Sequence, residues 1–447
     1  MFPYIPNTKQ DEERMLEALG IEDVDELFRD IPDSIRLNRR LNIQPPLSEL
    51  EVSKRVKGLA RKNISTEDAI CFLGAGAYDH YIPSVVGRLV SRSEFYTSYT
   101  PYQPEINQGT LQAIFEFQTM IANLTGMDIS NASVYDGATA TAEAALMAVD
   151  RGKGNKIVIS QSVHPEVREV VRTYMNAKDI RVVEVGTKDG ITDMEELEQE
   201  VDRDTLGVIL QSPNFFGIIE DVTRGVELAH ENKALMIMNV DPISLGILKT
   251  PGEYGADIAV GEGQSLGNPL NFGGPYLGFM AVKKALMRKL PGRISGQSVD
   301  KDGNRAFTLT LQAREQHIRR EKAISNICSN QALNALTATI YMATMGRKGL
   351  REAALQSAQK AKYTYQALLD TGKFEEVHDR PFFKEFVLES PIDVEMLNRA
   401  LLEKGIIGGY NLERTYPERK NQVLFCVTEK RTKEEIDYLV QVLEGIL

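Results

Sequence analysis

Short apolar runs alternate with amphipathic segments through the middle of this chain, and this alternation restricts its fold more than any other feature. The run KIVIS at 156–160 precedes an amphipathic segment opened by Pro165, and the same order recurs up to LGFMAVK at 277–283. Apolar runs without polar alternation are typical of strands buried on both faces, and helices between them make such strands parallel. The sequence therefore predicts an α/β domain whose mostly parallel sheet is covered by helices and places ligands at the carboxyl ends of its strands.

Changes in this pattern divide the chain into three expected regions. Residues 1–60 carry charged amphipathic stretches and are predicted to form an N-terminal helical arm, of the kind that wraps a neighbouring subunit. Residues 61–320 are expected to form the large domain, and residues 321–447 a linking helix and a small C-terminal α+β domain. Within the last region, the small residues of 321–345 predict a long helix in close contact with another domain or subunit.

The composition of the 447-residue chain argues against several classes of protein. Its net charge of -11 disfavours a nucleic-acid partner, and no apolar run approaches the ~20 residues that cross a bilayer. The N-terminus has neither the basic nor the apolar segment of a signal peptide. Cys71, Cys328 and Cys426 are far apart and predict free thiols, and the lack of paired Cys and His spacings predicts no metal site. We expect a cytoplasmic protein without a membrane partner.

Two polar segments lie where a cofactor would bind: one precedes a predicted helix and the other follows a predicted strand. The small and hydroxylated residues of 133–142, with Gly137 and Thr139, open a helix whose N-terminal N–H groups suit an anion such as a cofactor phosphate. Asp241 follows the strand ALMIMNV, where an acid pairs with the pyridinium nitrogen of pyridoxal phosphate (PLP) in enzymes of this topology. A plain helix cap for the first segment and a turn-capping Asp for the second remain the alternatives.

A third segment decides whether covalent PLP chemistry is possible on this chain. In PLP-dependent enzymes of this topology, one turn of the sheet carries the Schiff-base lysine, because only an amine forms the imine. In this chain the corresponding turn follows the predicted strand ADIAVGE. No lysine occurs from Thr250 through Val282, and Gln264 lies in the turn. A carboxamide cannot form an imine. If the fold is as predicted, this chain does not bind PLP covalently.

Residues 96–109 form an aromatic and polar segment, YTSYTPYQPEINQG. Its two prolines keep the backbone extended, and its three tyrosines offer hydroxyl donors. Such a loop is able to reach into a site on another subunit, since loops carry function more often than their share of the chain. The alternative is an ordered surface loop.

Four longer motifs lie in order along the chain: FLGAGAYDHYIP at 72–83, YTPYQPEINQG at 99–109, YDGATATAEA at 135–144 and LQAREQHIRREKAISNIC at 311–328. Together they resemble the glycine cleavage system P-protein family, and within it the first subunit of the two-subunit glycine dehydrogenase (decarboxylating). The resemblance runs over essentially the whole chain, and the motifs are long and unusual. It implies a fold-type-I PLP-dependent transferase-like fold, with a small C-terminal domain and an N-terminal helical arm.

The resemblance also implies that the chain works in an α2β2 assembly with subunit 2 of the same enzyme. Subunit 2 binds PLP covalently, and the pocket is completed where the unlike subunits meet. The assembly decarboxylates glycine and passes the aminomethyl group to the lipoyl H-protein. Gln264 lies where the lysine of subunit 2 would be. Gly137, Thr139 and Asp241 are then remnants of a PLP site.

The family likeness turns the aromatic loop into a candidate contributor to the active site of the partner. The side chains expected to face that site are Tyr96, Tyr99, Tyr102 and Asn107, with Ser98 and Gln108 as further candidates. Two alternatives stay open. The chain is a non-catalytic structural or regulatory scaffold of the same complex, or it is an autonomous PLP-dependent enzyme that uses a lysine outside the expected turn.

Overall fold

The structure is a computed structural model that describes residues 4–37 and 39–447. The chain divides into two compact units, Met1–Ile64 and Ser65–Leu447. Among the described residues, no helix combines the length and the apolar character needed to span a bilayer.

The first unit contains the residues expected to form the helical arm. Its helices are α1 (Lys9–Leu19), the 3-10 helix η1 (Val24–Phe28) and α2 (Glu49–Ala60). Thr8 and Ser48 begin α1 and α2 with reciprocal capping boxes, in which each side chain accepts a backbone hydrogen bond and an acid three residues later bonds back to the cap. The local sequence thus accounts for where both α-helices begin.

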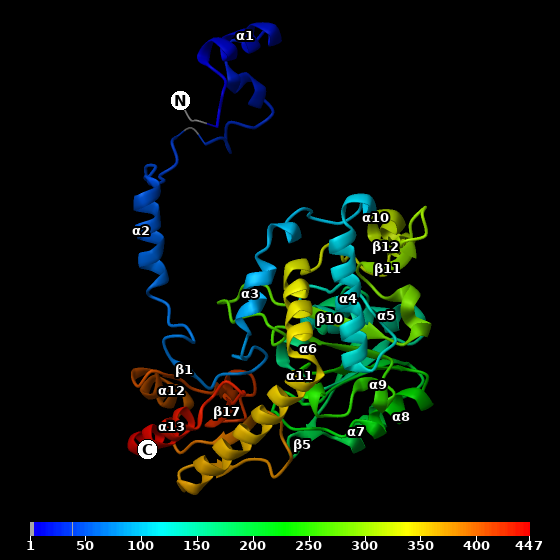
Figure 1. The fold of residues 1–447 in the computed structure, drawn as a ribbon, viewed down its shortest axis with the longest axis vertical. Coiled ribbons are helices and arrows are strands. Elements are labelled where there is room, and N and C mark those ends of the chain that lie inside the picture. Colours follow the sequence, from blue (N-terminus) through cyan, green and yellow to red (C-terminus); the bar gives the residue numbers. More distant parts are fainter. Residues whose placement is uncertain (1–3, 38) are drawn as a thin grey trace. The chain divides into compact units, whose positions relative to one another are not determined.

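The second unit is built on a seven-stranded sheet with the order β2-β10-β9-β8-β7-β3-β4 (Figure 1). Strands β9, β8, β7, β3 and β4 run parallel, whereas β10 is antiparallel to both of its neighbours. The sheet confirms the mostly parallel arrangement predicted from the apolar runs. Its strands are β2 (Ile129–Ser130), β3 (Lys156–Ser160), β4 (Arg181–Val185), β7 (Thr205–Gln211), β8 (Leu235–Asn239), β9 (Ile258–Glu262) and β10 (Gly278–Val282).

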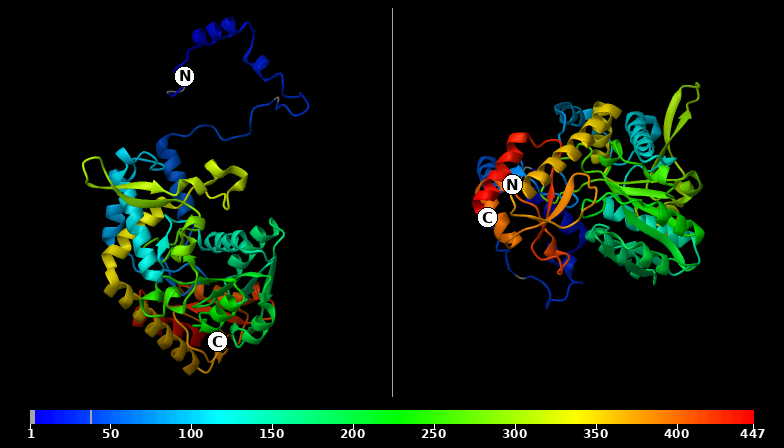
Figure 2. Two further views of the ribbon diagram at one scale, coloured as in Figure 1. Left: turned by 90° about the vertical axis from the view of Figure 1, so that its right-hand side faces the viewer. Right: turned by 90° about the horizontal axis from the view of Figure 1, so that it is seen from below.

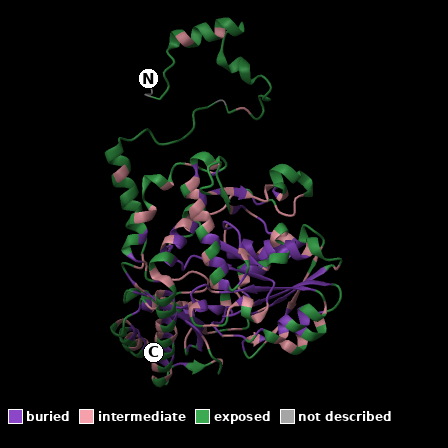
Figure 3. Cartoon of the chain, turned by 45° about the vertical axis from the view of Figure 1, so that its right-hand side comes forward, coloured by how far each residue is buried: buried purple, intermediate pink, exposed green. Residues whose placement is uncertain are grey.

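Helices cover both faces of this sheet, so its central strands are buried, whereas the edge strand β4 is partly exposed (Figures 2 and 3). Side chains alternate between two cores: Val158 and Met236 pack on one face, whereas Ile157 and Ile237 pack on the other. The first face is covered by α4 (Gln108–Thr125), α7 (Met194–Glu200), α8 (Thr223–Glu231) and α11 (Ala332–Asp370). The second face is covered by α5 (Gly137–Arg151) and α6 (Pro165–Asn176).

A four-stranded antiparallel sheet with the order β13-β14-β17-β16 forms the core of the C-terminal part. Phe386 and Phe425 from its strands pack with Leu397 and Leu439 from the helices beside it. Its elements are β13 (Glu375–Glu376), β14 (Glu385–Glu389), α12 (Val394–Glu403), β16 (Tyr410–Asn411), β17 (Gln422–Cys426) and α13 (Lys433–Ile446).

The predicted start of the helix at 321–345 is wrong, because α11 begins at Ala332. The Asn330 amide donates hydrogen bonds to the Ala132 carbonyl at 3.1 Å and to the Ser133 hydroxyl at 2.9 Å. These tertiary contacts hold the preceding segment in a non-helical path against the loop before α5. The helix also bends at Gly346, whose φ of 59° lies outside the helical region.

Several short elements complete the second unit. The hairpin of β11 (Ile294–Val299) and β12 (Arg305–Thr310) reaches out from the large sheet (Figure 2). The others are β1 (Ile70–Cys71), which pairs with β15 (Ile406–Ile407), β5 (Thr187–Lys188), which pairs with β6 (Ile191–Thr192), and the helices α3 (Ser84–Val90), α9 (Pro251–Tyr254) and α10 (Gln316–Arg319).

Candidate functional site

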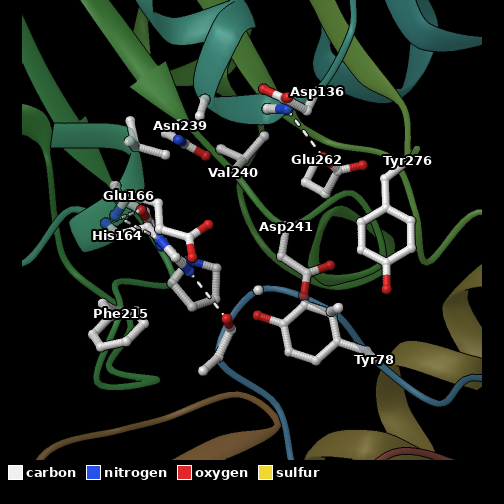
Figure 4. Close-up of a pocket in the computed structure, with 18 of the residues that line it drawn as sticks. Tyr78, Asp136, His164, Glu166, Phe215, Asn239, Val240, Asp241, Glu262 and Tyr276 are labelled. Carbon is white, nitrogen blue, oxygen red and sulfur yellow. Dashed lines mark hydrogen bonds between the residues drawn. The ribbon is translucent and has the colours of Figure 1, made fainter. Parts of the chain in front are cut away.

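A cavity of about 570 Å³ lies at the carboxyl ends of β3, β7 and β8, where the sequence places ligands (Figure 4). The large domain contributes the segment 75–78, the start of α5 and the turns after the three strands. The C-terminal part contributes the residues at the start of β14. The polar residues that line the cavity include Tyr78, Asp136, His164, Glu166, Gln211, Asn239, Asp241, Glu262, Tyr276, Lys384 and Glu385.

Gln264, in the turn after β9, is a structural residue that is almost fully buried, with 1% of its surface exposed. Its Oε1 accepts a hydrogen bond from the Tyr78 backbone N–H at 2.8 Å. Its Nε2 donates to the carbonyls of Tyr78 at 3.0 Å and Asn268 at 2.7 Å. The carboxamide therefore connects the segment around Tyr78 to the turn. Its oxygen and nitrogen both form hydrogen bonds with backbone groups.

The carboxyl group of Glu262 occupies the N-terminus of α5, where a cofactor phosphate was expected. Its Oε2 accepts from the Gly137 N–H at 3.0 Å, and its Oε1 accepts from the N–H groups of Gln264 at 3.0 Å and Leu277 at 2.8 Å. Asp136 caps the same helix through the Thr139 N–H at 2.7 Å, and Figure 4 shows the two acids beside each other. Burial raises the pKa of Glu262 to about 7, against the lowering effect of the three N–H donors.

Asp241 pairs with a lysine of the same chain. Its Oδ2 lies 2.5 Å from the Nζ of Lys384, and its Oδ1 accepts a hydrogen bond from the Ile243 N–H at 2.8 Å. Lys384 has 1% of its surface exposed, and its Nζ lies 3.4 Å from the centroid of the Tyr78 ring. The positive charge is thus held between a carboxylate and an aromatic face.

The same lysine continues into a polar network toward the C-terminal part. Its Nζ lies 2.9 Å from the Nε2 of His80, whose Nδ1 lies 2.6 Å from the Oε2 of Glu429. An ammonium group only donates hydrogen bonds, so Nε2 of His80 accepts and Nδ1 carries the proton. Asp241, Lys384, His80 and Glu429 form one chain of contacts across the boundary between the two sheets.

Two further ionisable groups line the cavity but are satisfied within the chain. Glu385 accepts from the Ala75 N–H at 2.7 Å and from the Tyr78 hydroxyl at 2.9 Å, and burial raises its pKa to about 7. The Nε2 of His164 bonds to the Ala75 carbonyl at 3.0 Å, and its ring meets Phe215 edge-on at 4.8 Å. Burial lowers the pKa of His164. Both groups hold the wall of the cavity in place.

The residues of this cavity do not fit PLP. A PLP site needs an amine for the imine, free N–H groups for the phosphate and a free acid for the ring nitrogen. Here Gln264 lies in place of the lysine, and its carboxamide is hydrogen-bonded to backbone carbonyls. The Gly137 N–H already donates to the Glu262 carboxyl group. The acid Asp241 is paired with Lys384.

The predicted partner-facing loop lies elsewhere in the second unit. Tyr96, Ser98 and Tyr99 line a second cavity of about 410 Å³ with residues from α4 and from 329–336. Tyr99 is 89% exposed, and its hydroxyl lies 3.2 Å from that of Ser329. Tyr102 lies outside this cavity lining, half exposed, with its ring 5.7 Å from the Arg293 guanidinium. The three tyrosines are thus placed on an open surface.

Asn107 and Gln108 turn inward and hold the loop. The buried amide of Asn107 donates to the Gln103 carbonyl at 2.8 Å. The Gln108 amide donates to the Phe307 carbonyl at 2.9 Å and accepts from the Phe307 N–H at 2.8 Å. These contacts join the start of α4 to the loop before it and to β12. The structure therefore separates the six candidates into three exposed tyrosines, two loop anchors and Ser98, whose buried hydroxyl has no hydrogen-bonding partner among the described residues.

The sequence interpretation missed the two residues that decide the chemistry of the main cavity. Glu262 ends the strand before the glycine-rich turn. An acid at the end of that strand could have indicated that a carboxyl group lies near the expected phosphate site. Lys384 comes from the C-terminal part, and no pattern in the sequence links it with Asp241. Of the residues named as remnants, Gly137 and Asp241 line the cavity, whereas the buried Thr139 only donates its N–H to Asp136.

Distant solved structures share the fold. A cysteine desulfurase from Thermococcus onnurineus NA1 is 15% identical and covers 85% of this chain and 95% of its own, with a TM-score of 0.64. A C-DES mutant with a lysine-to-alanine change, solved with glycine covalently linked to its PLP cofactor, is 14% identical and covers 85% and 97%, with a TM-score of 0.62. These likenesses confirm the predicted fold-type-I architecture of PLP-dependent enzymes.

Nearer relatives cover the whole chain. Probable glycine dehydrogenase (decarboxylating) subunit 1 is 57% identical in Moorella thermoacetica and 55% identical in Carboxydothermus hydrogenoformans, each over 99% of both chains. A crystal structure of glycine decarboxylase (P-protein) of the glycine cleavage system, in inhibitor-bound form, is 44% identical over 100% of both chains, with a TM-score of 0.90. A family model described as Glycine cleavage system P-protein matches residues 3–443. This chain belongs to the glycine cleavage system P-protein family.

Proposed function

We propose that this chain is the lysine-free subunit of a two-subunit glycine decarboxylase. The observation that carries the proposal is Gln264, a buried carboxamide in the turn where this fold holds its Schiff-base lysine. Relatives that match over nearly the whole chain bear the name subunit 1, which implies a second subunit. Subunit 2 binds PLP covalently in this proposal, in an α2β2 assembly with the lipoyl H-protein as the acceptor.

The role of this chain is to shape and close the active site of its partner. PLP bound there supplies the electron sink for decarboxylation of glycine. The exposed hydroxyls of Tyr96, Tyr99 and Tyr102 are available to donate hydrogen bonds across the subunit contact and to exclude water from it. Asn107 serves that role indirectly, because its amide is committed to the Gln103 carbonyl and keeps the loop in shape.

A scaffold without contact to the partner's active site is the second candidate. It is favoured by the inward orientation of Asn107 and Gln108, which leaves only part of the predicted set free to act on another chain. Under this alternative, the tyrosines stabilise the assembly but make no difference to turnover once the subunits are associated.

Reconstitution separates these functions. The chain is mixed with subunit 2 and lipoyl H-protein, and release of CO2 from glycine is measured beside each chain alone. We expect activity only from the mixture, and full activity of subunit 2 alone would overturn the proposal. Tyr99→Phe and Tyr96→Phe are expected to lower kcat by about ten-fold with assembly intact, the effect of losing one hydrogen bond. Tyr438→Phe, a partly exposed tyrosine in α13, is the matched control.

A further inference from the structure

We propose that this chain pairs the cofactor-binding groups of its own pocket with its own side chains, the Glu262 carboxyl group at the phosphate position and the Lys384 ammonium at the ring-nitrogen position. The inference goes beyond the missing lysine, because losing the lysine removes only the covalent bond. Donors for the phosphate and an acid for the ring nitrogen bind a pyridoxal compound without an imine, so the loss of the lysine alone does not close the pocket.

The phosphate position is closed by contact as well as by charge. A Cβ on Gly137 would lie 2.7 Å from the backbone nitrogen of Glu262, so the end of β9 lies directly against the first turn of α5. The Gly137 N–H, which would face a phosphate, already donates to the Glu262 carboxyl. Asp136 adds a second acid that accepts the Thr139 N–H. An incoming phosphate would meet two carboxyl groups where it needs donors.

The ring-nitrogen position is closed by a cation in the same way. Lys384 approaches Asp241 from the start of β14 and leaves no free carboxylate for a pyridinium N–H. The internal groups stand in for those of the cofactor: a carboxyl group at the helix N-terminus and a cation at the acid. The Gly137 N–H and the Asp241 carboxylate are therefore both paired within the chain itself.

The test uses pyridoxamine 5′-phosphate, which carries the phosphate and the ring but needs no lysine. Its fluorescence is titrated against the full-length chain, with folding of each variant checked by circular dichroism. We expect no saturation of the unaltered chain up to about 1 mM, and binding at least about ten-fold tighter for Glu262→Ala. Glu262→Ser, whose hydroxyl still accepts a backbone hydrogen bond, is expected to bind likewise and serves if the alanine variant does not fold.

Glu166→Ala is the matched control, because Glu166 lines the same cavity but lies exposed on α6 and away from the α5 N–H groups. We expect it to leave the pocket closed. Micromolar binding by the unaltered chain would overturn the inference. So would folded Glu262 variants that bind no tighter than the unaltered chain, or equal gains from Glu262→Ala and Glu166→Ala.

Discussion

The buried carboxyl group of Glu143 is expected to make the stability of this chain depend on pH. Glu143 in α5 is fully buried, and among the described residues its two oxygens make no hydrogen bond of good geometry, although Ser325 lies close enough to lower its pKa slightly. Burial raises its pKa to about 7, from an ordinary value of 4.5. The folded state therefore binds the proton more tightly than the unfolded state, so the stability gained by protonation is complete below about 4.5 and is lost as the pH rises through about 7.

Replacing Glu143 with Met is expected to stabilise the chain at pH 8 but much less at pH 5. The variant removes a charge that costs up to about 3 kcal/mol to bury when ionised. Thermal unfolding at the two pH values measures the difference. Glu169→Met, at an exposed position of α6, is the control and is expected to shift Tm little at either pH. An equal gain from Glu143→Met at both pH values would contradict the assignment.

The sequence allowed part of the site to be predicted at this scale. Gln264 and Asp241 were found because both follow the ends of apolar strands, where parallel sheets gather their functional groups. Glu262 and Lys384 were not, because their importance depends on contacts made only in the folded chain. Neither a carboxylate beside a helix start nor a lysine from another sheet leaves a periodic signal.

At the scale of elements, the loop before α4 depends on amide groups that bond to backbone. Gln108→Ala removes the donor and the acceptor that pair with Phe307, and leaves a partly buried N–H and carbonyl without them. We expect a loss of about 1–3 kcal/mol, with faster amide hydrogen exchange at Phe307. Gln112→Ala, a half-buried glutamine of the same helix that bonds only to the Glu116 side chain, is the control. Unchanged exchange at Phe307 in Gln108→Ala would show that the pairing does not hold the loop.

Glycines in helical elements are expected to respond to substitution with opposite signs. Gly346 has a φ of 59° and open space where a Cβ would lie. Gly346→Ala is therefore expected to destabilise the fold by about 1–3 kcal/mol through backbone strain and not through a steric clash. Gly87 in α3 also has open space but no positive φ, and Gly87→Ala is expected to stabilise by about 0.4–1 kcal/mol. Chemical unfolding of both variants tests the pair. A stabilised Gly346→Ala would contradict the bend in α11.

At the scale of the whole second unit, Lys384 holds the two sheets together through Asp241 and His80. Lys384→Met leaves a buried carboxylate without its cation, which costs about 3–5 kcal/mol in such pairs. The double variant with Asp241→Asn removes that charge as well and is expected to recover part of the loss. Limited proteolysis and unfolding midpoints report on both. A double variant that is as unstable as the sum of the single variants would mean that the two residues do not interact.

The overall architecture was predictable because it follows from local patterns. Apolar runs gave the strands of the parallel sheet, and caps such as Gly126 after α4 marked where helices end. The β11–β12 hairpin and the start of α11 were not predicted, because packing and hydrogen bonds from distant segments set them. Asn330, for example, keeps its segment out of the helix through bonds to residues near α5.

The central claim is that PLP in the assembled enzyme is bound by the partner and not by this chain. Borohydride reduction of the assembly with subunit 2, followed by peptide mapping, tests it most directly, with attention to the cavity residue Lys384. We predict a pyridoxyl group on a lysine of subunit 2 and none on this chain. A pyridoxyl-lysine at Lys384, or at any other lysine of this chain, would contradict the account.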